Sequence, residues 1–318
     1  MTLDDIKEEI LKAKKIVILT HESPDGDAIG SSMAVFLALK NIGKAPDVII
    51  PEMPKTFDFL PGIDEVKKDS DIEKYDLAIA LDCADIKRLN GFSRFFENAK
   101  KTIVIDHHSG NAMFGQYNYV NPVAPACAQI LSVIFDYFGI DITNEIGTCL
   151  IAGIITDTGG FKYSNVTSDT FDFAARLLDN GVNISEIYER VMQTVTLSRF
   201  NLTKIAVDRL ELLENGKIAF TYITMEDEKS VNAEIGDHEG IVEQGRSIEG
   251  VLVSVFLRET EQGFRVSLRA NNSSNINVAD ICMIFGGGGH IRAAGCLLQY
   301  PLEVAKDKIV EEIKRSII

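Results

Sequence analysis

Four short segments of the chain place carboxylate and imidazole side chains where an apolar run stops. In the clearest of them, a β-branched run at 102–105 is followed directly by one carboxylate and two imidazoles. An uncompensated buried carboxylate is very costly, and these segments hold no Arg or Lys until Lys162, which follows the last of them. Divalent metal ions are therefore the expected compensation. The candidate residues are His21, Asp25, Asp27, Asp82, Asp106, His107, His108 and Asp157.

Six of these residues form a set whose charge matches two divalent cations. The set has four carboxylates and two imidazoles, from His21, Asp25, Asp27, Asp82, His107 and Asp157. Oxygen-rich sites with some imidazole and no thiolate suit manganese, with magnesium, iron or cobalt as substitutes, whereas zinc prefers fewer and softer ligands. Two such metals about 3.5–4 Å apart can deprotonate a water and clamp both oxygens of an in-line phosphoryl displacement. The ligand set therefore predicts phosphoester hydrolysis.

Each segment also has a purely structural interpretation. The loop from His21 to Asp27 could be a polar turn in which Asp27 caps the following helix, a common use of aspartate. Asp106, His107 and His108 by themselves could form a surface turn. The recurrence of the same pattern at the ends of four apolar elements favours the metal site.

A second pattern lies near the end of the chain, where Gly286, Gly287, Gly288 and Gly289 are followed by His290. A glycine run lets backbone N–H groups approach an anion closely, and a helix beginning after it would add its dipole. Alone, such a run is more typical of a flexible surface turn. Apolar helical residues before the run, with His290 and Arg292 after it, favour an anion site instead.

The elements that would position the first set follow an alternation of strands and helices. Strands are expected at 15–20, 45–50, 75–81 and 102–105, and each is continuously apolar, as in a parallel sheet covered on both faces. Helices are expected at 4–14, 28–40, 92–99, 126–138, 144–156 and 168–178. Open sheets of this kind bind ligands at the carboxyl ends of their strands, which is where the polar segments fall.

The second half of the chain has a different texture. Residues 184–213 predict two successive helices without a strand between them. Beyond them, strands are expected at 217–223, 250–259 and 264–270, and helices at 278–285 and 303–313. We therefore expect an α/β protein with an N-terminal parallel-sheet domain (1–185), a helical connector (186–213) and a smaller mixed α/β C-terminal domain (214–318).

Composition limits the classes of function. The 318 residues, 46% hydrophobic and 25% charged, are typical of a soluble globular chain with two domains. A net charge of −15 argues against binding along long nucleic acid, because that affinity comes from neutralising phosphates with Lys and Arg. No apolar run approaches the roughly 20 residues of a membrane span, and the N-terminus has no signal-peptide core. The five scattered cysteines predict reduced, core-filling thiols in a cytoplasmic protein.

The four polar segments, in this order and each after an apolar element, resemble the four motifs of the DHH phosphoesterase superfamily. The resemblance implies a two-domain architecture with the active site in the cleft between the domains, and a binuclear manganese site. It implies that His21 and Asp25 hold one metal, and that Asp27 and His107 hold the other. Asp82 would bridge the two metals.

The resemblance also implies roles for the remaining candidates. Asp157 would complete the ligand set, Asp106 would orient an imidazole, and His108 would contact the scissile phosphate. The segment Gly286–His290 resembles the GGGH motif of the DHH-associated C-terminal domain, which holds the nucleotide end of the substrate against the metals. Arg269 ends a predicted strand where that domain places a phosphate-binding arginine, although a surface arginine on a strand is the structural alternative.

The resemblance covers the whole chain and so narrows the expected activity. RecJ-type exonucleases are longer, membrane-bound cyclic-dinucleotide phosphodiesterases carry transmembrane segments, and family II pyrophosphatases carry a Ser-Arg-Lys-Lys-Gln run that this chain lacks. The compact nanoRNase/pAp-phosphatase class remains, and it implies degradation of short oligonucleotides to mononucleotides and dephosphorylation of 3′-phosphoadenosine 5′-phosphate (pAp).

Two rival functions stay open at this point. A stand-alone phosphodiesterase for c-di-AMP or pApA would use the same residues, and a non-catalytic nucleotide-binding regulator is the rival from another class. The expected partners are short RNA or DNA oligonucleotides and nucleoside bisphosphates, without long duplex nucleic acid or a membrane. Oligomeric state is left open, a homodimer included.

Overall fold

The computed structural model describes residues 2–72 and 74–317. The chain forms two compact units that divide after Thr194. Each unit has its own sheet and its own hydrophobic core. Among the described helices, none combines the length and the apolar character that a membrane span requires.

The sheet of the N-terminal unit has five parallel strands in the order β2-β1-β3-β4-β5. The strands span Ile16–Leu19 (β1), Asp47–Ile49 (β2), Leu77–Leu81 (β3), Lys101–Asp106 (β4) and Tyr117–Val120 (β5). Successive side chains of β1 point to opposite faces, so that Ile16 and Ile18 join one core while Val17 and Leu19 join another. This double burial explains why β1 and β3 are apolar at every position.

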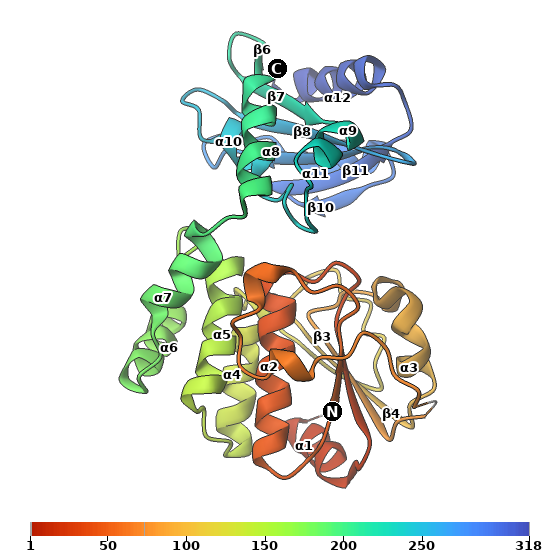
Figure 1. Ribbon diagram of the computed structural model, residues 1–318, viewed down its shortest axis with the longest axis vertical. Helices are drawn as coiled ribbons and strands as arrows, with labels where there is room; N and C mark the ends of the chain where they lie inside the picture. Colours follow the sequence, from red (N-terminus) through yellow and green to blue (C-terminus); the bar gives the residue numbers. More distant parts are fainter. Residues whose placement is uncertain (1, 73, 318) are drawn as a thin grey trace. The chain divides into compact units, whose positions relative to one another are not determined.

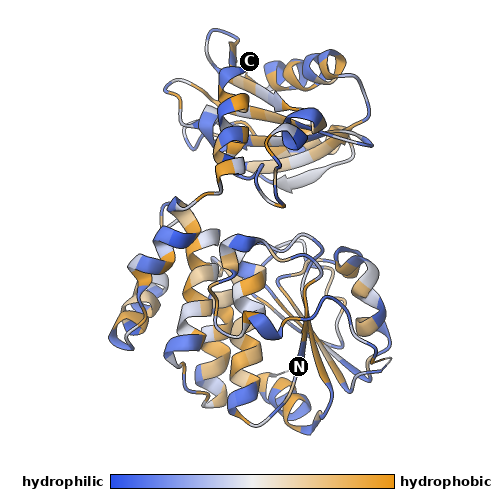
Figure 2. Cartoon of the chain, viewed as in Figure 1, coloured by the Kyte–Doolittle hydropathy of each residue, from blue (hydrophilic) through white to orange (hydrophobic). Residues whose placement is uncertain are grey.

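Helices cover the two faces of this sheet unequally (Figure 1). Helices α1, α2, α4 and α5 lie over the face that receives Ile16 and Ile18, whereas α3 lies over the opposite face. The helices of the unit span Leu3–Lys12 (α1), Gly26–Asn41 (α2), Ser93–Glu97 (α3), Cys127–Phe138 (α4), Asn144–Asp157 (α5), Ser168–Asp179 (α6) and Ile184–Tyr188 (α7). Hydrophobic residues run along the strands and the covering helices in Figure 2.

The contact between α2 and α5 depends on two glycines. A Cβ atom on Gly30 would lie 2.4 Å from the carbonyl oxygen of Cys149, and one on Gly153 would lie 2.8 Å from Oδ1 of Asp27. Real side chains do not tolerate such distances, so glycine is required for the two helices to approach this closely. The close approach brings Asp27, at the start of α2, beside α5, which ends at Asp157.

The C-terminal unit has a six-stranded mixed sheet in the order β10-β11-β9-β8-β7-β6. Strands β7 and β8 pair in parallel, and the other ladders among the described residues of this sheet are antiparallel. Its strands span Glu211–Leu213 (β6), Ile218–Ile223 (β7), Val253–Thr260 (β8), Gly263–Ala270 (β9), Gly288–His290 (β10) and Ala293–Leu298 (β11). Its helices span Leu197–Asp208 (α8), Met225–Ser230 (α9), Ile241–Arg246 (α10), Val278–Ile284 (α11) and Leu302–Ile317 (α12). Helices α11 and α12 share one core with the sheet, and α8 and α10 share another.

The predicted α/β fold class is confirmed, and the predicted strands and helices are present with ends shifted by a few residues. Strands β5, β6, β10 and β11 and helices α9 and α10 were not predicted. No helix begins directly after the glycine run to add a dipole, because residues 288–290 form β10 and pair with β11. All five cysteines are buried free thiols, as the core-filling interpretation predicts.

The two units divide inside the segment 186–213, and the last residues of that segment, 211–213, pair with β7 as strand β6 rather than continuing a helix. The assignment of 186–213 to a separate connector stays a prediction, and so does an active site in a cleft between the domains.

Candidate metal centre

The predicted ligands meet at the carboxyl edge of the N-terminal sheet. His21 follows β1, Asp82 follows β3 and His107 follows β4, so that three neighbouring strands end at the same place. Asp27 comes from the first turn of α2 and Asp157 from the last turn of α5. A parallel sheet brings such strand ends together regardless of their distance in sequence.

Asp82 lies at the centre of the cluster. It is 1% exposed, and its backbone has φ +50°, a left-handed conformation that is uncommon for a residue other than glycine. Its Oδ1 lies 3.4 Å from Nε2 of His107 and 3.6 Å from Nδ1 of His108, and its Oδ2 lies 3.8 Å from Nε2 of His21. One buried carboxylate therefore faces three imidazoles.

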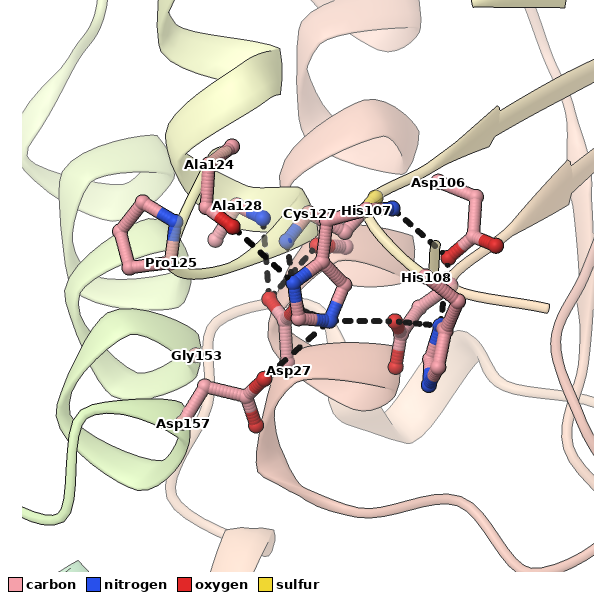
Figure 3. A network of polar contacts seen from close by, with 12 residues as sticks. Asp27, Asp106, His107, His108, Ala124, Pro125, Cys127, Ala128, Gly153 and Asp157 are labelled. Carbon is pink, nitrogen blue, oxygen red and sulfur yellow. Dashed lines mark hydrogen bonds and ion pairs between the residues drawn. The ribbon is translucent and has the colours of Figure 1, made fainter. Parts of the chain in front are cut away.

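His107 faces the carboxylates of α2 and α5 (Figure 3). Its Nε2 lies 3.3 Å from Oδ2 of Asp157 and 3.9 Å from Oδ2 of Asp27. Its Nδ1 lies 3.2 Å from the carbonyl oxygen of Ala124, which can only accept a hydrogen bond. Donation from Nδ1 to this carbonyl leaves Nε2 as the ligating nitrogen, an arrangement typical of metal-binding histidines.

The two aspartates before and within α2 have different backbone partners. Oδ1 of Asp25 accepts hydrogen bonds from the N–H groups of Asp27 and Ala28, so Asp25 caps α2. The alternative in which Asp27 caps its own helix is therefore wrong. Both oxygens of Asp27 instead accept from the first turn of α4, at 2.5 Å from N of Cys127 and 2.9 Å from N of Ala128 (Figure 3).

Asp106 is fully buried behind the cluster and holds His108. Its Oδ1 accepts from the N–H of His107 and lies 2.8 Å from Nδ1 of His108, and its Oδ2 accepts from Nδ2 of Asn111 at 2.6 Å. Burial opposes a charge on Asp106, yet these donors hold its pKa below the usual value. The hydrogen bond with Asp106 raises the pKa of His108. Because Nδ1 is engaged, contact between His108 and a substrate would be made by Nε2.

The electrostatics of the cluster favour added positive charge. Burial, followed by the charge of Asp82, raises the pKa of Asp27 to about 7, and burial and the Asp27 charge raise that of Asp157. Burial lowers the basicity of an imidazole, but the surrounding Asp82, Asp27 and Asp157 raise the pKa of His107 to about 10. Within the described parts of the chain, no Lys or Arg forms an ion pair with these carboxylates.

The donor set fits two divalent cations. Oδ1 of Asp82 and Nδ1 of His21 are buried atoms without a hydrogen-bond partner among the described residues, which is costly unless a ligand is bound. Ligand atoms within 4.8 Å of one another form the groups His21–Asp25–Asp82, Asp27–His107–Asp157 and Asp82–His107–His108. The first group contains the predicted pair of His21 and Asp25, and the second contains the predicted pair of Asp27 and His107 together with Asp157. That division stays a prediction.

The glycine run lies in the C-terminal unit, between α11 and β11. The N–H groups of Gly286 and Gly287 donate to the carbonyls of Met283 and Cys282, so they end α11. A Cβ atom on Gly287 would lie 2.2 Å from the carbonyl oxygen of Gly295, which requires glycine here. The last two glycines of the run lie in strand β10, so no helix dipole points at the run from behind. Anion binding by Gly286–His290 therefore stays a prediction that depends on the backbone N–H groups alone, without a helix dipole.

Arg269 lies on β9 and already has an acidic partner. Its Nε lies 3.1 Å from Oε1 of Glu243, and its Nη1 donates to the carbonyl of Leu268. A phosphate held by Arg269 would share the guanidinium with Glu243 or displace it. The phosphate-binding role of Arg269 stays a prediction.

Two residues near the cluster were missed in the sequence. Nδ2 of Asn111 donates to the carbonyl of Cys83 as well as to Asp106, and so ties the end of β3 to the end of β4. Arg88 lies six positions after Asp82, and its charge acts on His21. A search for cations beyond the polar motifs would have found Arg88. The contacts of Asn111 depend on a loop conformation that has no sequence signal.

Two protein-family models match the chain. The DHH family, N-terminal domain, matches residues 15–154, and the DHHA1 domain matches residues 215–318. Together they include every predicted site residue except Asp157.

Curated relatives and solved structures agree with these models. The bifunctional oligoribonuclease and PAP phosphatase NrnA of Thermus thermophilus is 33% identical over 317 residues, covering 97% of this chain and 93% of the relative. NrnA of Bacillus subtilis is 24% identical, covering 94% and 93%. The crystal structure of an exopolyphosphatase-related protein from Bacteroides fragilis has a TM-score of 0.90 at 28% identity, covering 98% and 95%. The manganese complex of Thermus thermophilus RecJ has a TM-score of 0.57 at 13% identity, covering 98% and 54%, and shows likeness of fold alone.

Proposed function

The chain belongs to the DHH family of phosphoesterases and carries a DHHA1 domain, and we propose that it is a manganese-dependent enzyme that degrades short oligonucleotides to mononucleotides and dephosphorylates pAp. The observation that carries the proposal is the convergence of six candidate ligands, five of them buried or half-buried, at one edge of the sheet, with no Lys or Arg paired to them among the described residues. Relatives that are named for both activities and match nearly the whole chain support the choice of substrates.

The proposal assigns the ligands to two cations. His21 and Asp25 would hold one cation, Asp27, His107 and Asp157 would hold the other, and Asp82 would serve both. Two divalent cations in such a site supply Lewis acidity toward a phosphate group and lower the pKa of water. Manganese is the proposed ion because the donors are oxygen and imidazole without thiolate, with magnesium or cobalt as substitutes.

The remaining residues act on the phosphate ester. His108 contacts the scissile phosphate through Nε2, and Asp106 fixes the ring by its hydrogen bond with Nδ1. Gly286–His290 and Arg269 hold the distal phosphate or the nucleotide end of the substrate. Binding of a single distal phosphate by a protein with a net charge of −15 favours short substrates, because binding of long nucleic acid requires many basic contacts. Five free buried thiols support a reducing compartment, and we place the protein in the cytoplasm.

A phosphodiesterase for c-di-AMP or pApA is the nearest alternative, because it would use the same ligands. The test is chromatography of the products from labelled RNA dimers, pentamers and a long single strand, with pAp, pApA and c-di-AMP in parallel. Each substrate is incubated with manganese and, separately, with EDTA. We expect manganese-dependent loss of the short RNAs and of pAp, with the long strand spared. Turnover confined to c-di-AMP or pApA would replace the proposal with the alternative.

A further inference from the structure

Arg88 is positioned beside the metal-binding edge by its backbone. It lies in a 3-10 segment, Ile86–Phe92 (η3), that follows Asp82. The carbonyl of Arg88 accepts a hydrogen bond of 2.8 Å from the N–H of Glu22, the residue after His21. Arg88 is therefore tied to the loop that carries two of the predicted metal ligands.

The side chain of Arg88 is half-buried beside the ends of two strands. Its 3-10 segment follows β3, and its carbonyl bonds to the residue after His21, which follows β1. Arg88 therefore lies near the carboxyl ends of β1 and β3.

Two carboxylates close to Arg88 along the chain or through its backbone hydrogen bond are engaged elsewhere. Oε2 of Glu22 accepts from Nδ2 of Asn90 at 2.8 Å, and Oδ1 of Asp85 accepts from the N–H of Lys87 at 2.8 Å. In the part of the chain that the structure describes, the Arg88 guanidinium has neither a hydrogen bond nor an ion pair. Several other arginines do pair with a carboxylate: Arg94, Arg176, Arg209, Arg258 and Arg269.

We propose that Arg88 is a substrate-binding residue whose guanidinium contacts a non-bridging oxygen of the reacting phosphate, on the His21–Asp25–Asp82 side of the metal centre. An arginine left unpaired beside acidic groups is suited to an incoming anion, and its planar fork matches two phosphate oxygens. Arg88 would neutralise negative charge on the phosphate, while the carboxylates of the metal-binding residues would remain bound to the cations. The role of Arg88 in hydrolysis rests on the proposed function, whereas the binding of a phosphate group by Arg88 can be tested without it.

The first test is calorimetric titration of inorganic phosphate into the manganese-loaded protein. We expect Arg88→Gln to weaken phosphate binding by about tenfold or more, the range of one charge-assisted contact, and Arg88→Lys to recover part of the loss. The matched control is Lys87→Gln, because Lys87 is an exposed neighbour whose side chain has no role in the proposal. Metal-induced thermal stabilisation is measured on each variant to show that the ligand cluster is intact. Phosphate binding by Arg88→Gln equal to that of Lys87→Gln would overturn the proposal.

The second test separates the reacting phosphate from a distal one. Hydrolysis of bis(p-nitrophenyl) phosphate, which has no distal phosphate, is compared with hydrolysis of pAp. We expect Arg88→Gln to lower kcat by about 100-fold on both, as for loss of one donor to developing charge. An effect confined to KM for pAp would assign Arg88 to the distal phosphate and contradict the proposal. Failure of the wild-type protein to hydrolyse any nucleotide would overturn the proposed function, while the phosphate titration would still decide the role of Arg88.

Discussion

The metal-binding edge of the N-terminal unit and the Arg269–Glu243 pair of the C-terminal unit differ in how their charges are balanced. At the edge, Asp27, Asp82 and Asp157 crowd around His107 with no Lys or Arg paired to them among the described residues. In the C-terminal unit, Arg269 already pairs with Glu243. The first region therefore depends on added cations, and the second is satisfied without a ligand. Substitutions at the edge should abolish function, whereas those in the C-terminal unit should only change affinity.

The largest effect is expected for Asp82→Ala. Asp82 belongs to two of the three ligand groups, so its removal should abolish both metal binding and hydrolysis, with activity falling by at least about a thousandfold. Metal content after gel filtration and turnover of pAp measure the two losses. Asp76→Asn is the control, because Asp76 precedes the same strand at its opposite end and bonds to the N–H groups of Lys14 and Lys15. Retained metal and activity in Asp82→Ala would remove the basis of the comparison.

The second prediction concerns the stability of the metal-free protein against pH. Burial raises the pKa of Asp27 from its usual value of 3.8 to about 7, so the folded state holds a proton that the unfolded chain releases. Stability from this proton is present below about pH 4 and is lost as the pH rises toward 7. The raised pKa values of Asp157 and His107 act in the same direction.

Bound cations should remove this dependence by displacing the protons. The difference in Tm between manganese-loaded and EDTA-treated protein should therefore widen from about pH 5 to about pH 8. Differential scanning fluorimetry across this range measures it. If the difference in Tm between the two forms narrows as the pH rises, the metal ions do not replace the protons on these carboxylates.

Asn111→Ala should have an intermediate effect. Asp106 is fully buried, and loss of the 2.6 Å hydrogen bond from Asn111 leaves one of its oxygens without that donor. We expect a loss of about 1–3 kcal/mol in the free energy of unfolding, the range for a buried unsatisfied group, and a fall in kcat of about tenfold as His108 loses its fixed orientation. Urea unfolding and steady-state kinetics measure the two effects. Asn98→Ala, at the end of α3, is a control for asparagine loss away from the cluster.

The same comparison shows what could be predicted from sequence. His21, Asp82 and His107 were found because each follows an apolar strand, and the ends of neighbouring parallel strands must share one edge. Asn111 and the carbonyl of Ala124 were not found, because their contacts depend on loop conformations. The strand formed by the end of the glycine run was not predicted, since four glycines have no local preference and only pairing with β11 decides the outcome.

The smallest effect is expected at the ion pair of Arg269 with Glu243. If Arg269 holds a distal phosphate, Arg269→Met should raise KM for pAp by about tenfold, the range of one charge-assisted contact, and leave kcat near the wild-type value. Glu243→Gln removes the competing carboxylate and should leave KM equal or slightly lower. Arg258→Met is the matched control, since Arg258 pairs with Glu228 at 2.7 Å on the neighbouring strand β8. Equal KM values for the two arginine variants would mean that the Arg269 pair is structural, and that substrate affinity resides at the metal-binding edge alone.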